Sequence, residues 1–401
     1  MKKTIIFGSA ILLIASSLLN CKPGSGGGSS SADSLTNVPS TIKINEEYDN
    51  IARYIACIPQ SDNSKYKGLE KLPLWVEEKN SYDTSWTKMV NSRLKPISEW
   101  AKKEIHPSIN PDAPVFYPFS GPDFLHAHYM YPNAKEYTMM ALEPVGNIPA
   151  IEKYSKDTTM LKSYLNYVNT SLKDIYDRSY FITSHMVNDF NDAKAKGVLS
   201  VLLVFLKRTN HDIISIQKFT MVSGGKIENY TDANKDSLEK SKIQGVTIEF
   251  KPANENVVKK ITYYSLDILD KTVDEKYPYF IDHLNNTLKG TNTFLKAASY
   301  LMHYETFDKI RKTTLGVSNS ILQDDTGIAF HYYNEGTNKD KWNYKLYGKY
   351  TKPIASFKGL KIQEDFKKMF DDSTKIKPLP FSLGYHWQDG YQNYMLATKK
   401  K

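Results

Sequence analysis

Two groups of acidic residues, each beside Gly or Pro, are the strongest candidates for chemistry in this chain. The first group is Asp123, in the run FYPFSGPDF, and Glu143, in the run LEPVG. The second group is Asp324 and Asp325, in the run QDDTG. Paired carboxylates can act as acid and base when their surroundings separate their pKa values, or they can hold a hard cation. These four acids are therefore the candidate catalytic residues.

A strand–helix–strand unit is expected to position the first group. The sequence predicts a short strand over residues 115–119, a helix over residues 124–131 that Pro132 stops, and a second strand over residues 137–142. A connection of this length favours parallel pairing of the two strands. Carboxyl ends of adjacent parallel strands border the crevice in which open α/β sheets bind ligands.

Asp123 and Glu143 are therefore expected to face one pocket, with Tyr117 and Ser120 as candidate ligand-binding residues. The alternative is that Ser120 and Asp123 only cap a helix, and that Glu143 only precedes a turn.

The second group is predicted just beyond the C-terminus of a helix near residues 307–320. Two acids at that end oppose the helix dipole, at a cost of ~0.3–1 kcal/mol each at an exposed site. A sequence that keeps Asp324 and Asp325 there has a use for their carboxylates. The alternative is a turn into the next strand, on which only one of the two would reach a given pocket.

Histidines and aromatic residues supply further candidates. His126 and His128 lie about 200° apart around a helix and cannot share a metal ion there. No Cys/His spacing typical of a zinc site is present, so neither a metal nor a cofactor is predicted. His331 and Trp387 belong to an aromatic-rich C-terminal region, and aromatics on strands can form a platform for sugar rings or peptides. The alternative is that these aromatics build the core.

The remaining pattern mixes helices with strands along the whole body. An apolar stripe from Leu161 to Ile175 predicts a helix, and Val198–Leu206 predicts a buried helix or strand. Further strands are expected near residues 213–216, 246–250, 261–264, 328–333, 344–350 and 381–387, and a further helix near residues 293–302. This order predicts a layered α/β or α+β domain with an aromatic-rich strand region near the C-terminus.

The N-terminus predicts export. Lys2 and Lys3 precede an apolar run over residues 5–19, which is shorter than the ~20 residues of a membrane-spanning helix. The Leu-Leu-Asn-Cys pattern that ends at Cys21 resembles the spirochaete-type lipobox, which implies that Cys21 is lipidated. We expect a signal peptide over residues 1–20, a lipidated, flexible Gly/Ser-rich tether over residues 21–44 and a single large α/β body over residues 45–401.

Charge and cysteine content limit the kinds of partner and of disulfide that this chain is expected to have. The formal net charge is +9, but short Lys pairs are scattered rather than gathered in a block, and an exported protein is not expected to meet nucleic acid. Cys57 is the only other cysteine, so a lipidated Cys21 leaves no intramolecular disulfide. The apolar neighbours of Cys57 indicate a small buried side chain.

The three body motifs, FYPFSGPDF, LEPVG and QDDTG, resemble those of an uncharacterised family of bacterial exported proteins. This resemblance implies no catalytic role. The sequence therefore predicts a lipoprotein held in the cell membrane or outer membrane by its lipid anchor, facing the periplasm or the cell surface. Its body is expected to bind an envelope glycan, a lipid headgroup or another envelope protein. The alternatives are an envelope hydrolase that uses the carboxylate cluster, or an inert structural or adhesive lipoprotein.

Overall fold

A computed structural model provides the fold, and residues 42–181, 197–231, 233–234, 243–354, 359–388 and 390–400 are described. The chain divides into two units between Ser40 and Thr41, and every described residue belongs to the second unit. The predicted signal peptide, Cys21 and most of the predicted tether lie outside the described residues.

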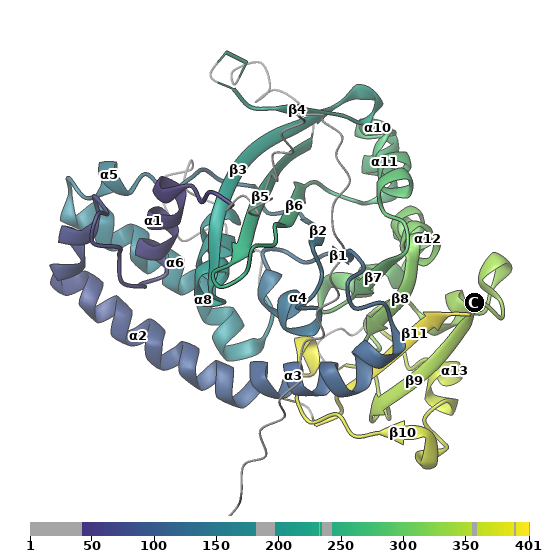
Figure 1. The fold of residues 1–401 in the computed structure, drawn as a ribbon. Coiled ribbons are helices and arrows are strands. Elements are labelled where there is room, and N and C mark those ends of the chain that lie inside the picture. Colours follow the sequence, from purple (N-terminus) through teal and green to yellow (C-terminus); the bar gives the residue numbers. More distant parts are fainter. Residues whose placement is uncertain are drawn as a thin grey trace, which may run out of the picture. The chain divides into compact units, whose positions relative to one another are not determined.

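The described residues form one mixed sheet of eleven strands, in the order β10-β9-β11-β8-β7-β1-β2-β6-β5-β3-β4 (Figure 1). The strands are β1 (Val115–Pro118), β2 (Glu136–Ala141), β3 (His211–Val222), β4 (Lys226–Asn229), β5 (Ile243–Pro252), β6 (Lys259–Ser265), β7 (Thr291–Phe294), β8 (Ser318–Gln323), β9 (Trp342–Gly348), β10 (Ile376–Lys377) and β11 (Asn393–Lys399).

The centre of the sheet is parallel and contains a reversal of strand order. Strands β8, β7, β1, β2 and β6 pair in parallel, while β3, β4 and β5 extend one side antiparallel and β11 pairs antiparallel on the other. From β1 the chain moves to β2 on one side, and it later returns to place β7 on the other side. The carboxyl ends of β1 and β7 therefore flank a topological switch point, where open α/β sheets bind ligands.

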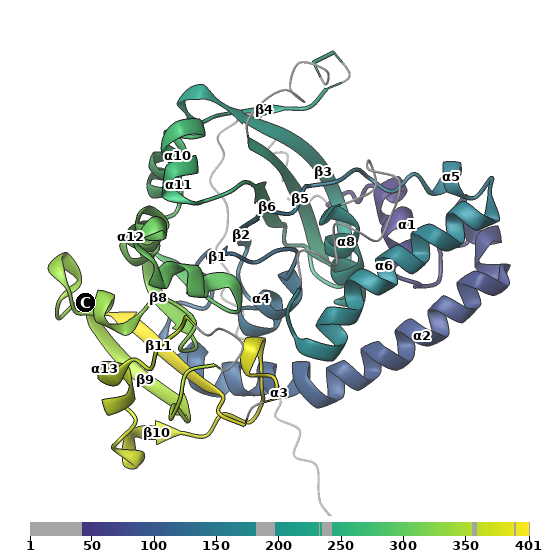
Figure 2. The same ribbon diagram turned by 180° about the vertical axis from the view of Figure 1, so that it is seen from behind.

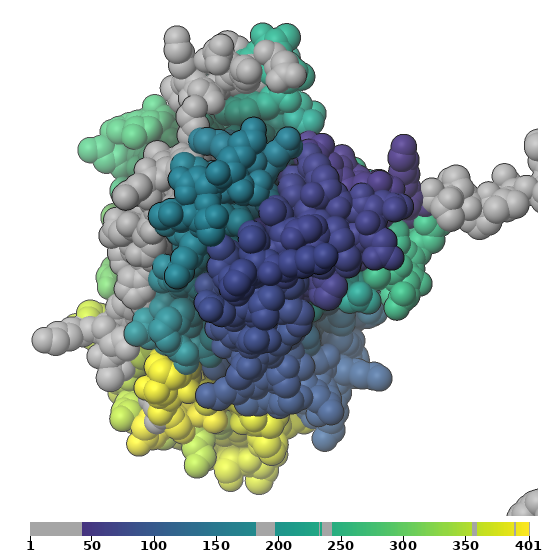
Figure 3. Space-filling view, turned by 90° about the vertical axis from the view of Figure 1, so that its left-hand side faces the viewer, coloured from purple at the N-terminus to yellow at the C-terminus, as the bar shows by residue number. Residues whose placement is uncertain are grey.

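Helices cover both faces of this sheet (Figures 1 and 2). The first face carries α1 (Glu46–Ile55), α2 (Pro73–Met89), α3 (Lys95–Trp100), α4 (Phe124–Met130), α5 (Ile151–Tyr154), α6 (Thr158–Arg178) and α8 (Leu199–Arg208). The second face carries α10 (Asp270–Lys276), α11 (Phe280–Thr287), α12 (Asp308–Val317) and α13 (Glu364–Lys368). Figure 3 shows the outer side of α1 and α2, with C-terminal residues beside them.

Alternating strand residues supply the two cores. On β1, Val115 and Tyr117 pack in the core of the first face, whereas Phe116 packs in the core of the second. All four residues of β1 are buried, as expected for a parallel strand with helices on both faces. The predicted layered α/β fold is thus confirmed, as is the strand–helix–strand unit, in which β1 pairs parallel with β2.

Several local predictions were wrong, and all concern short elements. Residues 293–302, predicted as a helix, contain the end of β7 and a 3₁₀ helix, Ala298–His303. The helix predicted over residues 307–320 ends at Val317, where β8 begins, so Asp324 and Asp325 follow a strand rather than a helix. Two features of the sequence hid these boundaries. Strong helix formers lie beside the four-residue strand β7, and the apolar stripe of α12 continues into β8.

Two predicted C-terminal strands are also absent from the described structure. Residues 328–333 include a 3₁₀ helix, Phe330–Tyr333, and residues 381–387 include another, Gly384–His386. The sequence analysis also missed the last strand, β11, which pairs with β8 and β9. Contacts between distant parts of the chain, rather than local aromatic content, determine which of these segments enter the sheet.

Candidate functional site

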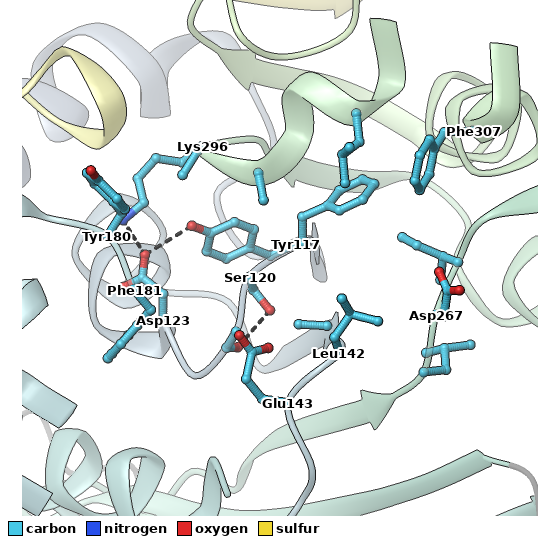
Figure 4. Close-up of a pocket in the computed structure, with 18 of the residues that line it drawn as sticks. Tyr117, Ser120, Asp123, Leu142, Glu143, Tyr180, Phe181, Asp267, Lys296 and Phe307 are labelled. Carbon is cyan, nitrogen blue, oxygen red and sulfur yellow. Dashed lines mark hydrogen bonds and ion pairs between the residues drawn. The ribbon is translucent and has the colours of Figure 1, made fainter. Parts of the chain in front are cut away.

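A cavity of about 150 Å³ opens at the carboxyl edge of the parallel strands, beside the switch point (Figure 4). This volume is comparable with that of cavities that hold a benzene ring. Segments that follow β1, β2, β6, β7 and α6 all contribute to its wall. The lining residues are Tyr117, Phe119, Ser120, Gly121, Asp123, Ala141, Leu142, Glu143, Tyr180, Phe181, Leu266, Asp267, Ile268, Lys296, Ala297, Ala298, Leu301, Phe307 and Tyr385.

A buried ion pair joins the two sides of the switch point. Lys296, which follows β7, places its Nζ 2.5 Å from Oδ2 of Asp123, which follows β1. The Lys296 side chain is 1% exposed and that of Asp123 is 2% exposed. Tyr117 on β1 donates its hydroxyl to the same Oδ2 at 3.0 Å. Figure 4 shows these three side chains converging on one point.

Asp123 also caps α4. Its Oδ1 accepts a hydrogen bond from the backbone N–H of His126 at 3.3 Å and lies 2.8 Å from Nδ1 of the same residue. The helix therefore begins at a carboxylate that satisfies one of its unpaired N–H groups. The expected cap at Ser120 was wrong, because the Ser120 hydroxyl instead donates to the carbonyl oxygen of Gly121 at 2.9 Å.

Lys296 also contacts the end of α6. Its Nζ donates to the carbonyl oxygen of Ser179, the C-terminal cap residue of that helix. A cation at this end of a helix is stabilised by the partial negative charge of the last carbonyls. Three separate elements, α4, α6 and the segment after β7, thus meet at one ammonium group.

The acceptors among the described residues use two of the three hydrogens of the Lys296 ammonium group. Nδ1 of His126 lies 2.8 Å from Asp123 and 3.2 Å from Nζ of Lys296, and it can make only one of these hydrogen bonds with its single hydrogen or lone pair. The shorter contact with a charged acceptor assigns the hydrogen to Nδ1, which donates to Asp123. Among the described residues, Lys296 then uses two hydrogens, on Asp123 and Ser179, and its third has no partner.

Burial and charge set the protonation of this cluster. Burial alone would raise the pKa of Asp123, but His126, Lys296 and their hydrogen bonds outweigh it and lower that pKa to about 2. Burial lowers the pKa of His126 to about 4, so the imidazole is neutral at pH 7. Burial also lowers the pKa of Lys296, although Asp123 opposes this shift. Asp123 is thus a permanent anion and a poor proton donor.

Backbone strain occurs on both loops of the switch point. Phe119, after β1, has φ 59°, and Ala297, after β7, has φ 60° and ψ −120°. A side chain in this region costs of order 1–3 kcal/mol and persists only where the surroundings fix it. The ion pair holds both loops in place and thereby accounts for the persistence of this strain.

Glu143 enters the same cavity from the segment after β2. Its carboxylate lies against Gly121, where an added Cβ would be 3.9 Å from Oε2. The backbone carbonyl of Glu143 accepts a hydrogen bond from Tyr263 of β6 at 2.8 Å. Gly146 has φ +77°. Gly197 packs against it so closely that a Cβ added to Gly197 would lie 2.4 Å from the backbone nitrogen of Gly146. The LEPVG run therefore fixes Glu143 at the cavity wall.

The cavity has a polar interior and an apolar mouth. Asp123, Glu143 and Lys296 are each at most 4% exposed, whereas Leu142 is 63% exposed. A Leu with this exposure at a cavity mouth leaves apolar surface ready for burial by a ligand. Phe119, Ile268, Leu301 and Phe307 continue the apolar lining.

The second acidic pair lies behind the cavity and is not part of its lining. Oδ1 of Asp324 accepts hydrogen bonds from the backbone N–H of Thr326 at 2.8 Å and from its hydroxyl at 2.5 Å. Asp325 lies 2.5 Å from Nε2 of His386 and accepts a hydrogen bond from Asn393 at 2.9 Å. The QDDTG run thus forms a turn that Asp324 closes, and Asp325 holds the C-terminal segment in place.

Asp324 nevertheless approaches the ion pair. A Cβ added to Gly384 would lie 3.0 Å from Cγ of Lys296 and 3.6 Å from Oδ2 of Asp324, so both groups border the same point. Oδ2 of Asp324 is buried without a hydrogen-bond partner among the described residues. Burial raises the pKa of Asp324 to about 6, and its neighbour Asp325 adds to the shift.

The structure brings together some of the candidate residues and separates others. Tyr117, Ser120, Asp123 and Glu143 line one cavity. His331 is exposed beside Tyr332, and Trp387 is half-buried, and neither lines it. Lys296 is not among the residues predicted from the sequence, since residues 293–302 were predicted as a helix. A single Lys within the run TFLKAA was the available signal.

Comparisons with known proteins add no relatives. A scan against protein-family models gives no match, and searches of curated proteins and of solved structures give none. Within the part of the chain that the structure describes, no group of three or more His, Cys, Asp or Glu side chains could hold a metal ion.

We expect Lys296→Met and Asp123→Asn each to lower the free energy of unfolding by about 3–5 kcal/mol, because each leaves one member of the pair buried alone. The double variant should lose less than the sum, by about 1–3 kcal/mol. Urea denaturation measures all three. The exposed Lys173–Asp177 pair is the control, and the same substitutions there should cost at most about 1 kcal/mol. Strictly additive losses at residues 123 and 296 would contradict the assigned pairing.

Asp324→Asn should change how stability depends on pH. A carboxyl whose pKa is raised on folding, here from 3.8 to about 6, stabilises the fold when protonated, and this contribution is lost as pH rises through that interval. The variant cannot titrate, so its stability relative to the unsubstituted protein should increase between about pH 4 and pH 7. Urea denaturation at several pH values gives this difference directly. A difference that does not vary with pH would show that Asp324 has an ordinary pKa.

Proposed function

We propose that this protein is a lipid-anchored exported binding protein that takes a small amphipathic molecule into the cavity beside β1 and β7. One observation carries the proposal: a cavity at the topological switch point has a buried ion pair inside and exposed Leu142 at its mouth. The polar head of the ligand would accept the remaining hydrogen of Lys296. Its apolar part would lie against the mouth.

Binding is favoured over hydrolysis because of how the carboxylates are used. Both oxygens of Asp123 are occupied by Tyr117, His126 and Lys296, and the low pKa of its carboxyl prevents it from acting as an acid at pH 7. Asp324 and Asp325 hold a turn and the C-terminal segment instead of lining the cavity. The four candidate acids therefore do not surround one cleft as the alternative of a carboxylate-cluster hydrolase requires.

The location in this proposal rests on the N-terminal sequence. Lys2, Lys3, the apolar run and Cys21 support lipidation, and residues 22–40 are rich in Gly and Ser, which supports a flexible tether. Among the described helices, none has the length and apolar character needed to cross a bilayer. The proposed partners are thus the membrane, through the anchor, and a small molecule of the envelope.

Three six-carbon probes test the cavity: hexan-1-ol, hexylammonium and hexanoate. Isothermal titration calorimetry should detect binding of at least one. Ala298→Phe places a ring in the cavity and should abolish that binding. Leu142→Ala should weaken it roughly three- to tenfold, because part of the buried apolar contact is lost. Val76→Ala, on exposed α2, is the matched control and should bind as the unsubstituted protein does. Absence of binding by all three probes, or equal binding by Ala298→Phe, would refute the cavity as the binding site.

Cys21→Ala tests the anchor. The full chain expressed in a bacterium with radiolabelled palmitate should carry label, and the variant should carry none, because Cys21 is the only proposed acceptor of the lipid. Cys57→Ala is the control and should keep the label, since Cys57 is buried, with 1% exposure. Label that persists in Cys21→Ala would overturn the proposal of a lipid anchor at that residue.

A further inference from the structure

A second cavity, of about 480 Å³, lies at the opposite edge of the sheet, where β2, β3 and β6 begin. Three connections form its wall: the segment between α4 and β2, the turn between α8 and β3, and the loop between β5 and β6. It shares no lining residue with the cavity at the carboxyl edge. Of the histidines considered as candidates from the sequence, His128 lines it and His126 does not.

Lys259, the first residue of β6, places an ammonium group in this cavity; burial lowers its pKa, and the more distant Glu255 and Asp112 oppose that shift. The residue is 6% exposed, and its Nζ donates to the carbonyl oxygen of Pro132. No carboxylate among the described residues forms an ion pair with it, which distinguishes it from buried Lys207 and Lys296. An ammonium group has three hydrogens, so two remain for a ligand. A buried cation without a partner is costly, and an anion at this point would remove that cost.

Two histidine rings, of buried His211 and half-buried His128, line the same cavity as Lys259. The rings of His128 and His211 are 4.8 Å apart and nearly perpendicular, packed against Phe124 and Phe250. Nδ1 of His128 is buried and has no hydrogen-bond partner among the described residues. Nδ1 of His211 lies 2.9 Å from the Thr209 hydroxyl. Burial lowers the pKa of both rings, to about 4 for His211, so each ring is neutral at pH 7 and carries a single N–H. The ring of His211 already has the Thr209 hydroxyl and the Leu206 carbonyl as partners.

The charges around this cavity favour one small anion. Lys135 adds a second ammonium group at the exposed side, and Asn133, Asn210 and Asn254 add amide groups that can donate. Asp112 and Glu255 also line the cavity, but both are exposed and neither pairs with Lys259. They act on Lys259 from beyond ion-pair distance and would partly oppose an anion there.

We propose that this cavity binds a phosphate-type oxyanion, with Lys259 as its principal charged partner and His128 and His211 beside it. A tetrahedral oxyanion presents enough oxygens to meet an ammonium group and two imidazoles together, and lysine binds phosphate as a point charge. The anion could be free phosphate or the phosphate of a small ester. The proposal is independent of the amphipathic ligand at the carboxyl edge.

Titration with inorganic phosphate and with glycerol 3-phosphate at pH 7 tests the site, with chloride keeping the ionic strength constant. Isothermal titration calorimetry should show saturable binding of at least one of them at millimolar concentration or below, and the tighter of the two identifies free or esterified phosphate. Lys259→Met should weaken binding by about tenfold or more, the loss of one charge-assisted hydrogen bond. Lys260→Met is the matched control, because the side chain of Lys260, the next residue in the sequence, is 38% exposed and pairs with Glu136.

Two surface variants test the proposal even if Lys259→Met does not fold. Glu255→Gln removes an exposed carboxylate at the cavity and should tighten phosphate binding several-fold, whereas Lys135→Gln should weaken it. Both residues are exposed, so neither change disturbs the core. No binding of either anion, equal binding by Lys259→Met and the unsubstituted protein, or no opposite response of the two surface variants would overturn the proposal.

Discussion

The buried pair of Asp123 and Lys296 is the interaction on which the rest of the site depends. Two opposite charges removed from water are stable only when each is surrounded by hydrogen-bond partners, and here Tyr117, His126 and the Ser179 carbonyl supply them. These partners come from β1, α4 and the end of α6. One ion pair therefore fixes the loops after β1 and β7 and the end of a helix relative to one another. The cavity has a defined shape because these segments cannot move independently.

This arrangement also explains why strained backbone is found beside the pair. Ala297 keeps a conformation that residues with a side chain rarely adopt, and it follows directly after Lys296. Moving the chain there to an unstrained conformation would displace the ammonium group from Asp123. The strain is thus the geometric consequence of bringing the end of a short strand to a buried carboxylate.

The sequence predicted the β1–α4–β2 unit well because its signals are local. Pro122, Asp123 and Pro132 mark the limits of the helix within a few residues of one another, and it lies between the fully buried β1 and the partly buried β2. That unit also predicted that Asp123 and Glu143 lie at the same edge of the sheet. The partner of Asp123 could not be predicted in the same way. Lys296 lies far away in the sequence, after a four-residue strand that local propensity cannot distinguish from the helical residues beside it.

The QDDTG run is a second case in which local sequence could not predict the role of a side chain. Its acids were candidates for chemistry or for a turn, and local pattern could not decide between them. In the fold, Asp324 closes the turn through Thr326, while Asp325 reaches His386 and Asn393 in the C-terminal segment. The carboxylates are thus used in folding, and through Tyr385 that segment completes the cavity wall. A motif of acids can therefore support the wall of a cavity without lining it.

The cavity beside the switch point is the proposed ligand site of this protein. Crystals soaked with a library of small organic fragments test this proposal, because electron density shows where each fragment binds without any assumption about the natural ligand. We predict that fragments will gather between Lys296 and Leu142, with their polar atoms toward Lys296 and their apolar atoms toward the mouth. Fragments that bind repeatedly elsewhere while this cavity stays empty of them would contradict the claim.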